Sequence, residues 1–291
     1  MKVLEALGWA NDKLGSMLDA EVLLSAILRV SKSWLFTHLD QALTEAQDEE
    51  FRSAVRRRMT GEPVAYIVGR KAFYKRDFSV NRFVLIPRPA TETLVEHAIE
   101  TAKSSPPEET IVGDIGTGSG AIAVTIAAET RLPTIASDIS PEALSVARAN
   151  AVAHSVDNIL DFRQGDLAEP LLNLFESLKT MNATPFSHLV LAANLPYLPE
   201  QRRTELQPDI RDFEPASALF GGGDGLELYW RLVRQLSRGR HLLPARTSLF
   251  WEIDPTQTQT IQTLIIHDFP HAQPSIVRDL DGFDRIVIAE I

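Results

Sequence analysis

The second part of the chain alternates between short apolar segments and amphipathic segments, and this alternation most constrains the fold. From residue 110 onward we expect strands at 110–115, 134–138, 158–163, 187–193, 247–253, 274–279 and 284–291, with helices at 119–130, 141–154, 225–239 and 255–268. Such an alternation predicts a mostly parallel sheet covered by helices on both faces. The last two strands are too close in sequence for a helical crossover, so we predict an antiparallel hairpin at one edge.

The N-terminal part is expected to be helical over residues 1–60. An apolar stripe with three- and four-residue spacing predicts one helix within 18–28, and a second is predicted from about 44 to 59. Gly61-Glu-Pro63 then disfavours further helix.

Short aromatic and β-branched segments at 65–68, 71–74 and 78–80 predict a β-hairpin next. We therefore expect three parts: a helical domain at 1–63, a hairpin linker at 64–90 and an α/β domain at 91–291.

Charge and cysteine content limit the partners. The chain carries 29 Lys and Arg against 39 Asp and Glu, a net charge of −10. An acidic surface repels phosphate backbones, which argues against duplex nucleic acid as the main partner. The absence of cysteine excludes disulfides and cysteine-ligated metals, and we expect no metal site. Without a signal peptide or a run of roughly 18 apolar residues, we expect a soluble cytoplasmic protein without a membrane partner.

A glycine-rich segment, Asp114-Ile-Gly-Thr-Gly-Ser-Gly120, closes the first strand of the α/β domain and opens a helix. Glycine lets the backbone turn sharply and approach a ligand closely, although it also serves tight packing of a strand against a helix. The spacing is not the G-x-G-x-x-G of dinucleotide sites, which disfavours that alternative. The candidate cofactor-binding residues here are Gly116, Thr117, Gly118, Ser119 and Gly120.

Acidic residues follow the next two strands. Asp138 ends the second strand, where a carboxylate can accept both hydroxyls of a ribose; the alternative role of helix cap suits Ser140 better. Asp166 ends the third strand, where its carboxylate can meet an adenine amino group and Leu167 can flank the ring; the alternative is an ordinary turn. Because ligands bind at the carboxyl ends of parallel strands, the three segments together predict an S-adenosyl-methionine site.

Asn194-Leu195-Pro196-Tyr197 follows the apolar run 188–193 and can grip a planar amide. If Asn194 Oδ1 accepts one N–H and a backbone carbonyl accepts the other, the amide nitrogen is aimed and its electron density is raised. Proximity to a sulfonium methyl can then supply much of the rate, and Tyr197 can lie against the amide and the cation. The alternative is an ordinary strand-to-loop turn. We predict that these four residues are catalytic.

Several motifs occur in an order that resembles one family. They are the segments 84–93, 114–123 and 194–197, Glu214-Pro followed by Gly221-Gly-Gly-Asp-Gly225, Glu252-Ile253, and Asp279-Leu-x-Gly-x-x-Arg285. With them, essentially the whole chain resembles the PrmC/HemK family of protein-(glutamine-N5) methyltransferases. The Pro-Arg-Pro-x-Thr-Glu segment is the most family-specific motif, whereas most class I methyltransferases share the glycine loop.

The resemblance implies a class I (Rossmann-like) α/β fold: a seven-stranded, mostly parallel sheet with an antiparallel last strand, preceded by a small helical substrate-recognition domain and the hairpin linker. It also implies S-adenosyl-methionine as cofactor, S-adenosyl-homocysteine as product, and the glutamine in the Gly-Gly-Gln loop of class 1 peptide chain release factors as substrate. The family's donor site corresponds to Gly116 to Gly120, Asp138, Leu167 and Asn194, and its substrate site to Asn194, Leu195, Pro196 and Tyr197.

Two positions depart from the family pattern. Leu195 replaces the first proline of Asn-Pro-Pro-Tyr, and Ala90 replaces an acid in Pro-Arg-Pro-Asp/Glu-Thr-Glu. Leucine keeps the main-chain carbonyl that the chemistry needs, and Pro196 still favours an extended residue before it. We therefore expect reduced preorganisation at Leu195, and at Ala90 the loss of a surface or capping role.

Three other functions fit parts of this pattern. A glutamine methyltransferase for a ribosomal protein would have identical catalytic residues. An adenine-N6 nucleic-acid methyltransferase would use the same logic on an amino group but should carry a basic target-recognition region. A non-catalytic S-adenosyl-methionine-binding protein would have Leu195 as its first sign of lost activity.

Overall fold

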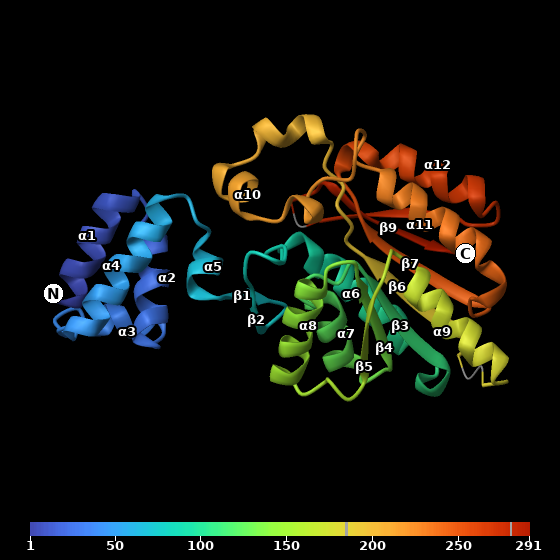
Figure 1. Ribbon diagram of the computed structural model, residues 1–291, viewed down its shortest axis with the longest axis horizontal. Helices are drawn as coiled ribbons and strands as arrows, with labels where there is room; N and C mark the ends of the chain where they lie inside the picture. The colour runs from blue at the N-terminus through green and yellow to red at the C-terminus, as the bar shows by residue number, and fades with distance from the viewer. Residues whose placement is uncertain (184–185, 280) are drawn as a thin grey trace. The chain divides into compact units, whose positions relative to one another are not determined.

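The computed structural model describes residues 1–183, 186–279 and 281–291, in two compact units (Figure 1). Unit 1 comprises Met1–Arg70, Val80–Arg82 and Leu206–Glu214, and unit 2 comprises Lys71–Ser79, Phe83–Glu205 and Pro215–Ile291. Leu280, part of the last family motif, lies outside the described residues. Within the described ranges, no helix is long and apolar enough to span a membrane.

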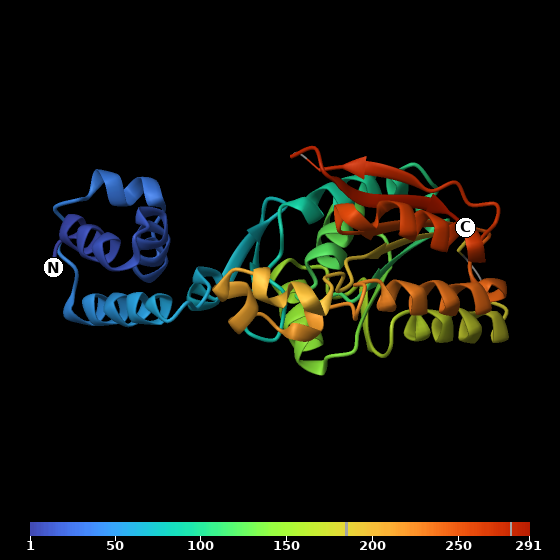
Figure 2. The ribbon, with the colours of Figure 1, turned by 90° about the horizontal axis from the view of Figure 1, so that it is seen from above.

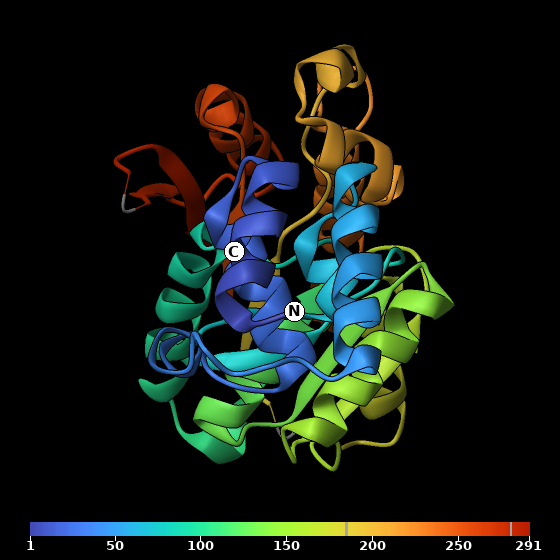
Figure 3. The ribbon, with the colours of Figure 1, turned by 90° about the vertical axis from the view of Figure 1, so that its left-hand side faces the viewer.

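Unit 1 is helical, as expected for residues 1–60. Its helices are α1 (Val3–Leu14), α2 (Met17–Leu28), α3 (Lys32–Thr37), α4 (Glu45–Met59), α5 (Val64–Val68) and α10 (Pro208–Phe213). Figure 3 looks onto this unit. Its core is made by the apolar stripes of α1, α2 and α4, which bury Leu7, Leu23, Leu24, Phe51 and Val55. The core of unit 1 thus comes from the spacing that predicted the helices.

The expectation of a strand at 65–68 was wrong. These residues form the single helical turn of α5, which follows Pro63 and ends at Gly69 in the left-handed conformation, at φ 77°. An apolar run of five residues is too short to distinguish the period of a strand from that of a helix. Its packing against the core of unit 1 favours the helical turn. The two-stranded sheet that follows pairs β1 (Arg70–Phe73) with β2 (Arg76–Ser79). Tyr74 and Lys75 turn between them, both at positive φ.

Unit 2 contains a seven-stranded sheet in the order β5-β4-β3-β6-β7-β9-β8. The strands are β3 (Thr110–Ile115), β4 (Thr134–Asp138), β5 (Leu160–Gln164), β6 (His188–Ala193), β7 (Arg246–Glu252), β8 (Ser275–Arg278) and β9 (Asp284–Glu290). Neighbours from β5 to β7 pair in parallel, and β9 is antiparallel to both β7 and β8. The predicted mostly parallel sheet with a reversed last strand is confirmed.

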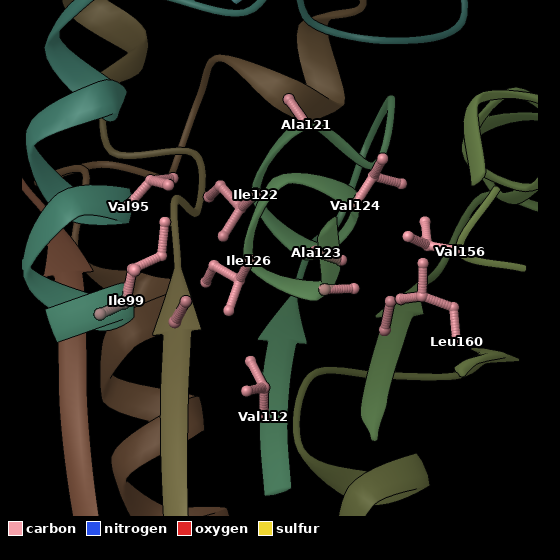
Figure 4. Packing of buried hydrophobic residues seen from close by; sticks show 14 of the residues in the cluster. Val95, Ile99, Val112, Ala121, Ile122, Ala123, Val124, Ile126, Val156 and Leu160 are labelled. Atoms are coloured by element: carbon pink, nitrogen blue, oxygen red, sulfur yellow. The ribbon is translucent and has the colours of Figure 1, made fainter. Parts of the chain in front are cut away.

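Helices cover both faces of this sheet (Figure 1 and Figure 2). One face carries α6 (Ala90–Lys103), α7 (Ala121–Thr130) and α8 (Pro141–Ala153), and the other carries α9 (Glu169–Thr180), α11 (Glu227–Arg238) and α12 (Thr258–Asp268). Figure 4 shows the first face, where Val95 and Ile99 of α6, Ile122 and Ile126 of α7 and Val112 of β3 belong to one buried cluster. The sequence had not predicted α9.

Glycines 118 and 120 test the packing of the loop between β3 and α7. Both have positive φ, but a Cβ on Gly120 would lie 3.1 Å from the Ala147 Cβ of α8, whereas Gly118 has no atom within 4 Å of that position. Gly120→Ala should therefore lower the free energy of unfolding by about 1–3 kcal/mol more than Gly118→Ala, because only the former adds crowding to backbone strain. Urea unfolding without cofactor measures both; equal losses would mean that α7 and α8 are not in close contact there.

Candidate active site

The carboxyl ends of β3, β4, β5 and β6 border a cavity of about 370 Å³ in unit 2. This volume lies within the usual range for small-molecule sites, and the location is the one expected for open α/β sheets. The structure brings most of the predicted residues to its wall, namely Gly116, Thr117, Gly118, Ser119, Asp138, Asp166, Leu167, Asn194, Leu195 and Pro196.

Two of the predicted site residues do not line the cavity. Gly120 begins α7 and is packed against Ala147 and Val124. The Tyr197 hydroxyl donates a hydrogen bond to Oε1 of Glu252 at 3.0 Å. Burial and the nearby Glu252 carboxylate raise the pKa of Tyr197 far above its ordinary value, so this hydroxyl stays protonated and remains a donor.

Two carboxylates hold the glycine loop. Asp114 is buried at the end of β3, and its Oδ2 accepts hydrogen bonds from Thr117 Oγ1 at 2.6 Å and from the Ala123 N–H at 3.1 Å. Oδ2 of Asp138 accepts from the Gly118 N–H at 2.9 Å, across from the neighbouring strand. These hydrogen bonds join the glycine loop to β3, to the start of α7 and to the end of β4, and so they keep it in one conformation.

Asp138 can still receive a ligand. Its Oδ1 accepts from the Ser140 N–H at 2.9 Å, and burial raises the pKa of the carboxyl. The two oxygens have about four lone pairs in all and the Gly118, Ile139 and Ser140 N–H groups use at most three, so an acceptor site remains for a hydroxyl. Ser140 itself caps α8 by accepting from the Ala143 N–H at 3.0 Å, the role expected of it.

Asp166 is already paired. Arg231 of α11 donates from one nitrogen to both carboxylate oxygens at 2.7 Å, and Gln235 donates to Oδ2 at 3.0 Å. Arg231 also lines the cavity, as Leu167 does. No local pattern indicated Arg231, because its pairing with Asp166 joins segments 65 residues apart.

A buried carboxylate on β7, Glu252, organises the Asn194 segment. Its Oε2 accepts from Thr91 Oγ1 at 2.6 Å and from Asn194 Nδ2 at 3.1 Å, and Asn194 Nδ2 lies 3.1 Å from Thr91 Oγ1. Burial raises the pKa of Glu252. Both Thr91 and Glu252 stand in the family motifs, but sequence reasoning assigned neither a role at the site.

Leu195 packs where the two loops of the site meet. Its side chain is 2% exposed, and Cδ2 lies 3.0 Å from the position of a Cβ on Gly116. Its N–H donates to the Tyr229 hydroxyl at 3.4 Å. No described residue donates to its carbonyl oxygen, which leaves that acceptor available.

Two further segments line the cavity and were not predicted from the sequence. One is the segment that includes Val84, Pro87, Arg88 and Thr91, and the other includes Pro215, Ser217, Ala218 and Phe220. The Pro-Arg-Pro segment stood out as the most family-specific motif, but proline fixes only φ and does not show that the segment lines a cavity. Glu92 of the same motif has a structural contact, since its Oε1 accepts from the Tyr74 N–H at 3.0 Å.

Known proteins resemble the chain over its whole length. The PrmC N-terminal domain family matches residues 5–69. The release factor glutamine methyltransferase of Bacillus cereus is 35% identical over 297 residues, covering 100% of both chains, and that of Bacillus subtilis is 35% identical, covering 99% of this chain and 98% of its own. The solved hMettl16 catalytic domain, at 12% identity and a TM-score of 0.54, covers 84% of this chain and 81% of that one, and shares the fold.

The Asp114 carboxyl makes stability depend on pH. Burial raises its pKa to about 7, so the folded protein favours the protonated form. Its contribution to stability is full below the unfolded pKa near 4 and is lost as the pH rises through about 7. Between pH 5 and 8, wild type should lose about 2–3 kcal/mol relative to Asp114→Asn. Urea unfolding at four pH values measures this difference; curves that stay parallel would contradict it.

Proposed function

This chain belongs to the release factor glutamine methyltransferases, the PrmC/HemK family, and from that premise we propose that it methylates the side-chain amide nitrogen of a release-factor glutamine. We propose further that the target is the Gly-Gly-Gln glutamine of class 1 release factors. One observation carries this proposal: the Asn194 amide is held at the wall of the cavity, next to the glycine loop, with Oδ1 free of any donor among the described residues.

S-adenosyl-methionine fits the cavity as cofactor. The residues that would hold it are the loop from Gly116 to Ser119, Asp138 for ribose hydroxyls, and Asp166 with Leu167 for the adenine. When bound, the cofactor supplies an electrophilic methyl group on a sulfonium. The acidic side chains suit this cation and its hydroxyl groups, and the cavity volume suits a nucleoside-sized ligand.

The residues of the 194–197 segment would position the acceptor. Asn194 Oδ1 and the Leu195 carbonyl are the two acceptors for the hydrogens of a primary amide, and they sit on consecutive residues. Holding the nitrogen in place lets the methyl transfer start from a preorganised geometry, which can lower the activation free energy by about 7–11 kcal/mol at best. Tyr197 acts through its hydrogen bond to Glu252, since its ring does not line the cavity.

Replacement of Asn194 tests the amide grip. Asn194→Ala should lower turnover at least about 100-fold, because the oriented acceptor is lost, and should leave cofactor affinity within a few fold. Asn158→Ala, an exposed asparagine of unit 2, is the matched control and should behave as wild type. Labelled methyl transfer is measured with purified release factor, ribosomal proteins and DNA, and mass spectrometry locates the methyl. Label on ribosomal proteins or DNA alone would overturn the proposed substrate.

Replacement of Leu195 by the proline of the family tests the backbone acceptor. Leu195→Pro keeps the carbonyl, fixes φ near −65°, and loses the long hydrogen bond to Tyr229 and part of the buried side chain. We expect turnover to stay within about threefold of wild type or to rise. Steady-state kinetics with release factor measures it, and a loss greater than tenfold would show that the leucine N–H or side chain is needed.

A further inference from the structure

Glu252 is the buried charge nearest to the proposed amide grip. It ends β7, it is 1% exposed, and it receives three donors from two separate segments: Thr91 at the start of α6, and Asn194 and Tyr197 after β6. In the proposed function it serves only as the acceptor for the Tyr197 hydroxyl. A buried carboxylate costs stability unless its hydrogen bonds are satisfied, so its surroundings deserve a physical account.

The hydrogen bonds around Glu252 determine which way the Asn194 amide faces. Thr91 has one hydroxyl hydrogen, which it donates to Glu252 Oε2 at 2.6 Å, so towards Asn194 it can only accept. Glu252, when ionised, also only accepts. The two oxygens are each 3.1 Å from Asn194 Nδ2 and 2.6 Å from each other, so from the nitrogen they are closer in direction than the two N–H bonds of an amide, and one N–H can point between them. The reversed amide would place Oδ1 against two acceptors.

We propose that Glu252 is a positioning residue for the methyl transfer: as a carboxylate it fixes the Asn194 amide with Oδ1 directed to the acceptor nitrogen, and it strengthens that oxygen as a hydrogen-bond acceptor. This rests on the proposed function of Asn194. The polarising effect follows because an amide N–H bound to a charge shifts electron density towards the amide oxygen. Thr91 and Tyr197 are the side chains that hold Glu252 in turn.

Several groups around Glu252 favour its ionised form. Burial raises its pKa, while the hydrogen bonds from Thr91 and Tyr197 and the positive charges of Arg285 and Arg88 oppose that effect. Arg285 is anchored by Asp279, with its Nε 3.1 Å from the carboxylate, and the Tyr229 hydroxyl donates to the Glu252 backbone carbonyl. Protonated Glu252 would instead have to donate a hydrogen, for example to the Tyr197 hydroxyl, which donates to the ionised form. Turnover should therefore fall as the pH drops, with an acid limb above the ordinary glutamic acid range near 4.

Kinetics of three variants and one control variant test the proposal. Thr91→Val is isosteric and removes one hydrogen bond to Glu252 and one acceptor for Asn194; Thr91→Ser keeps both. Glu252→Gln can face its oxygen to Thr91 and Asn194 and its nitrogen to the Tyr197 hydroxyl, so it keeps the orientation and removes the charge. We expect Thr91→Val and Glu252→Gln to lower kcat about 10- to 100-fold with KM values and cofactor affinity within a few fold. Thr91→Ser should recover most of the turnover, and Thr101→Val, on the same helix, should change nothing.

The pH profile separates positioning from a merely structural role. The acid limb of wild type should be absent from Glu252→Gln, because an amide does not titrate in this range. A variant that is only less stable would keep the wild-type limb at the temperature where it is folded. Unchanged kcat in both Thr91→Val and Glu252→Gln would overturn the proposal.

Nuclear magnetic resonance provides a readout without methyl transfer. With asparagine labelled by ¹⁵N, Asn194→Ala identifies the side-chain amide signals of Asn194. In wild type these signals should shift with the titration of Glu252, and their hydrogens should exchange slowly with solvent. In Glu252→Gln the pH-dependent shift should be absent. In Thr91→Val the hydrogen exchange should be faster. Signals that ignore pH in wild type would overturn the proposal. Wild type that titrates as expected but leaves release factor unmethylated would instead refute the proposed function.

Discussion

Parallel pairing of β5, β4, β3, β6 and β7 is the constraint on which the site depends. Because these strands run in one direction, their carboxyl ends meet at one edge of the sheet, and each end delivers a polar residue there. In chain order, the ends of β3, β4, β5, β6 and β7 carry one such residue each: Asp114, Asp138, Asp166, Asn194 and Glu252. Residues up to 138 positions apart in sequence thus share one small region of unit 2.

The carboxyl groups at these ends serve mainly as hydrogen-bond acceptors for other protein groups. Asp114 and Asp138 hold the glycine loop, Asp166 holds Arg231 of α11, and Glu252 holds Thr91 and Asn194. Each carboxyl group is hydrogen-bonded to protein donors in place of water, and this keeps the neighbouring segment in one conformation before any ligand binds. Preorganisation of this kind lowers the reorganisation that binding and catalysis would otherwise require.

Sequence patterns were sufficient wherever a local rule decides the structure. The strand and helix periods located the sheet to within one or two residues at most ends, and the short connection before β9 predicted its reversed direction. Residues 65–68 were assigned wrongly because five apolar residues fit a strand or a helical turn equally well. The helix α9 was not predicted. The packing of Gly120 against α8 was not predicted either, because a glycine in such a motif can serve ligand binding or tight packing.

The sequence by itself determined the fold class, the family and the residues at the strand ends, because periodicity and short motifs are local properties of a chain. The tertiary structure alone decided how these residues act together. It placed Tyr197 against Glu252 and away from the cavity wall, added Arg231 and the Pro-Arg-Pro segment to that wall, and joined Thr91 to Asn194 through a buried carboxylate. A hydrogen bond between segments far apart in sequence exists only after the strands are paired in register, and no local pattern contains that information.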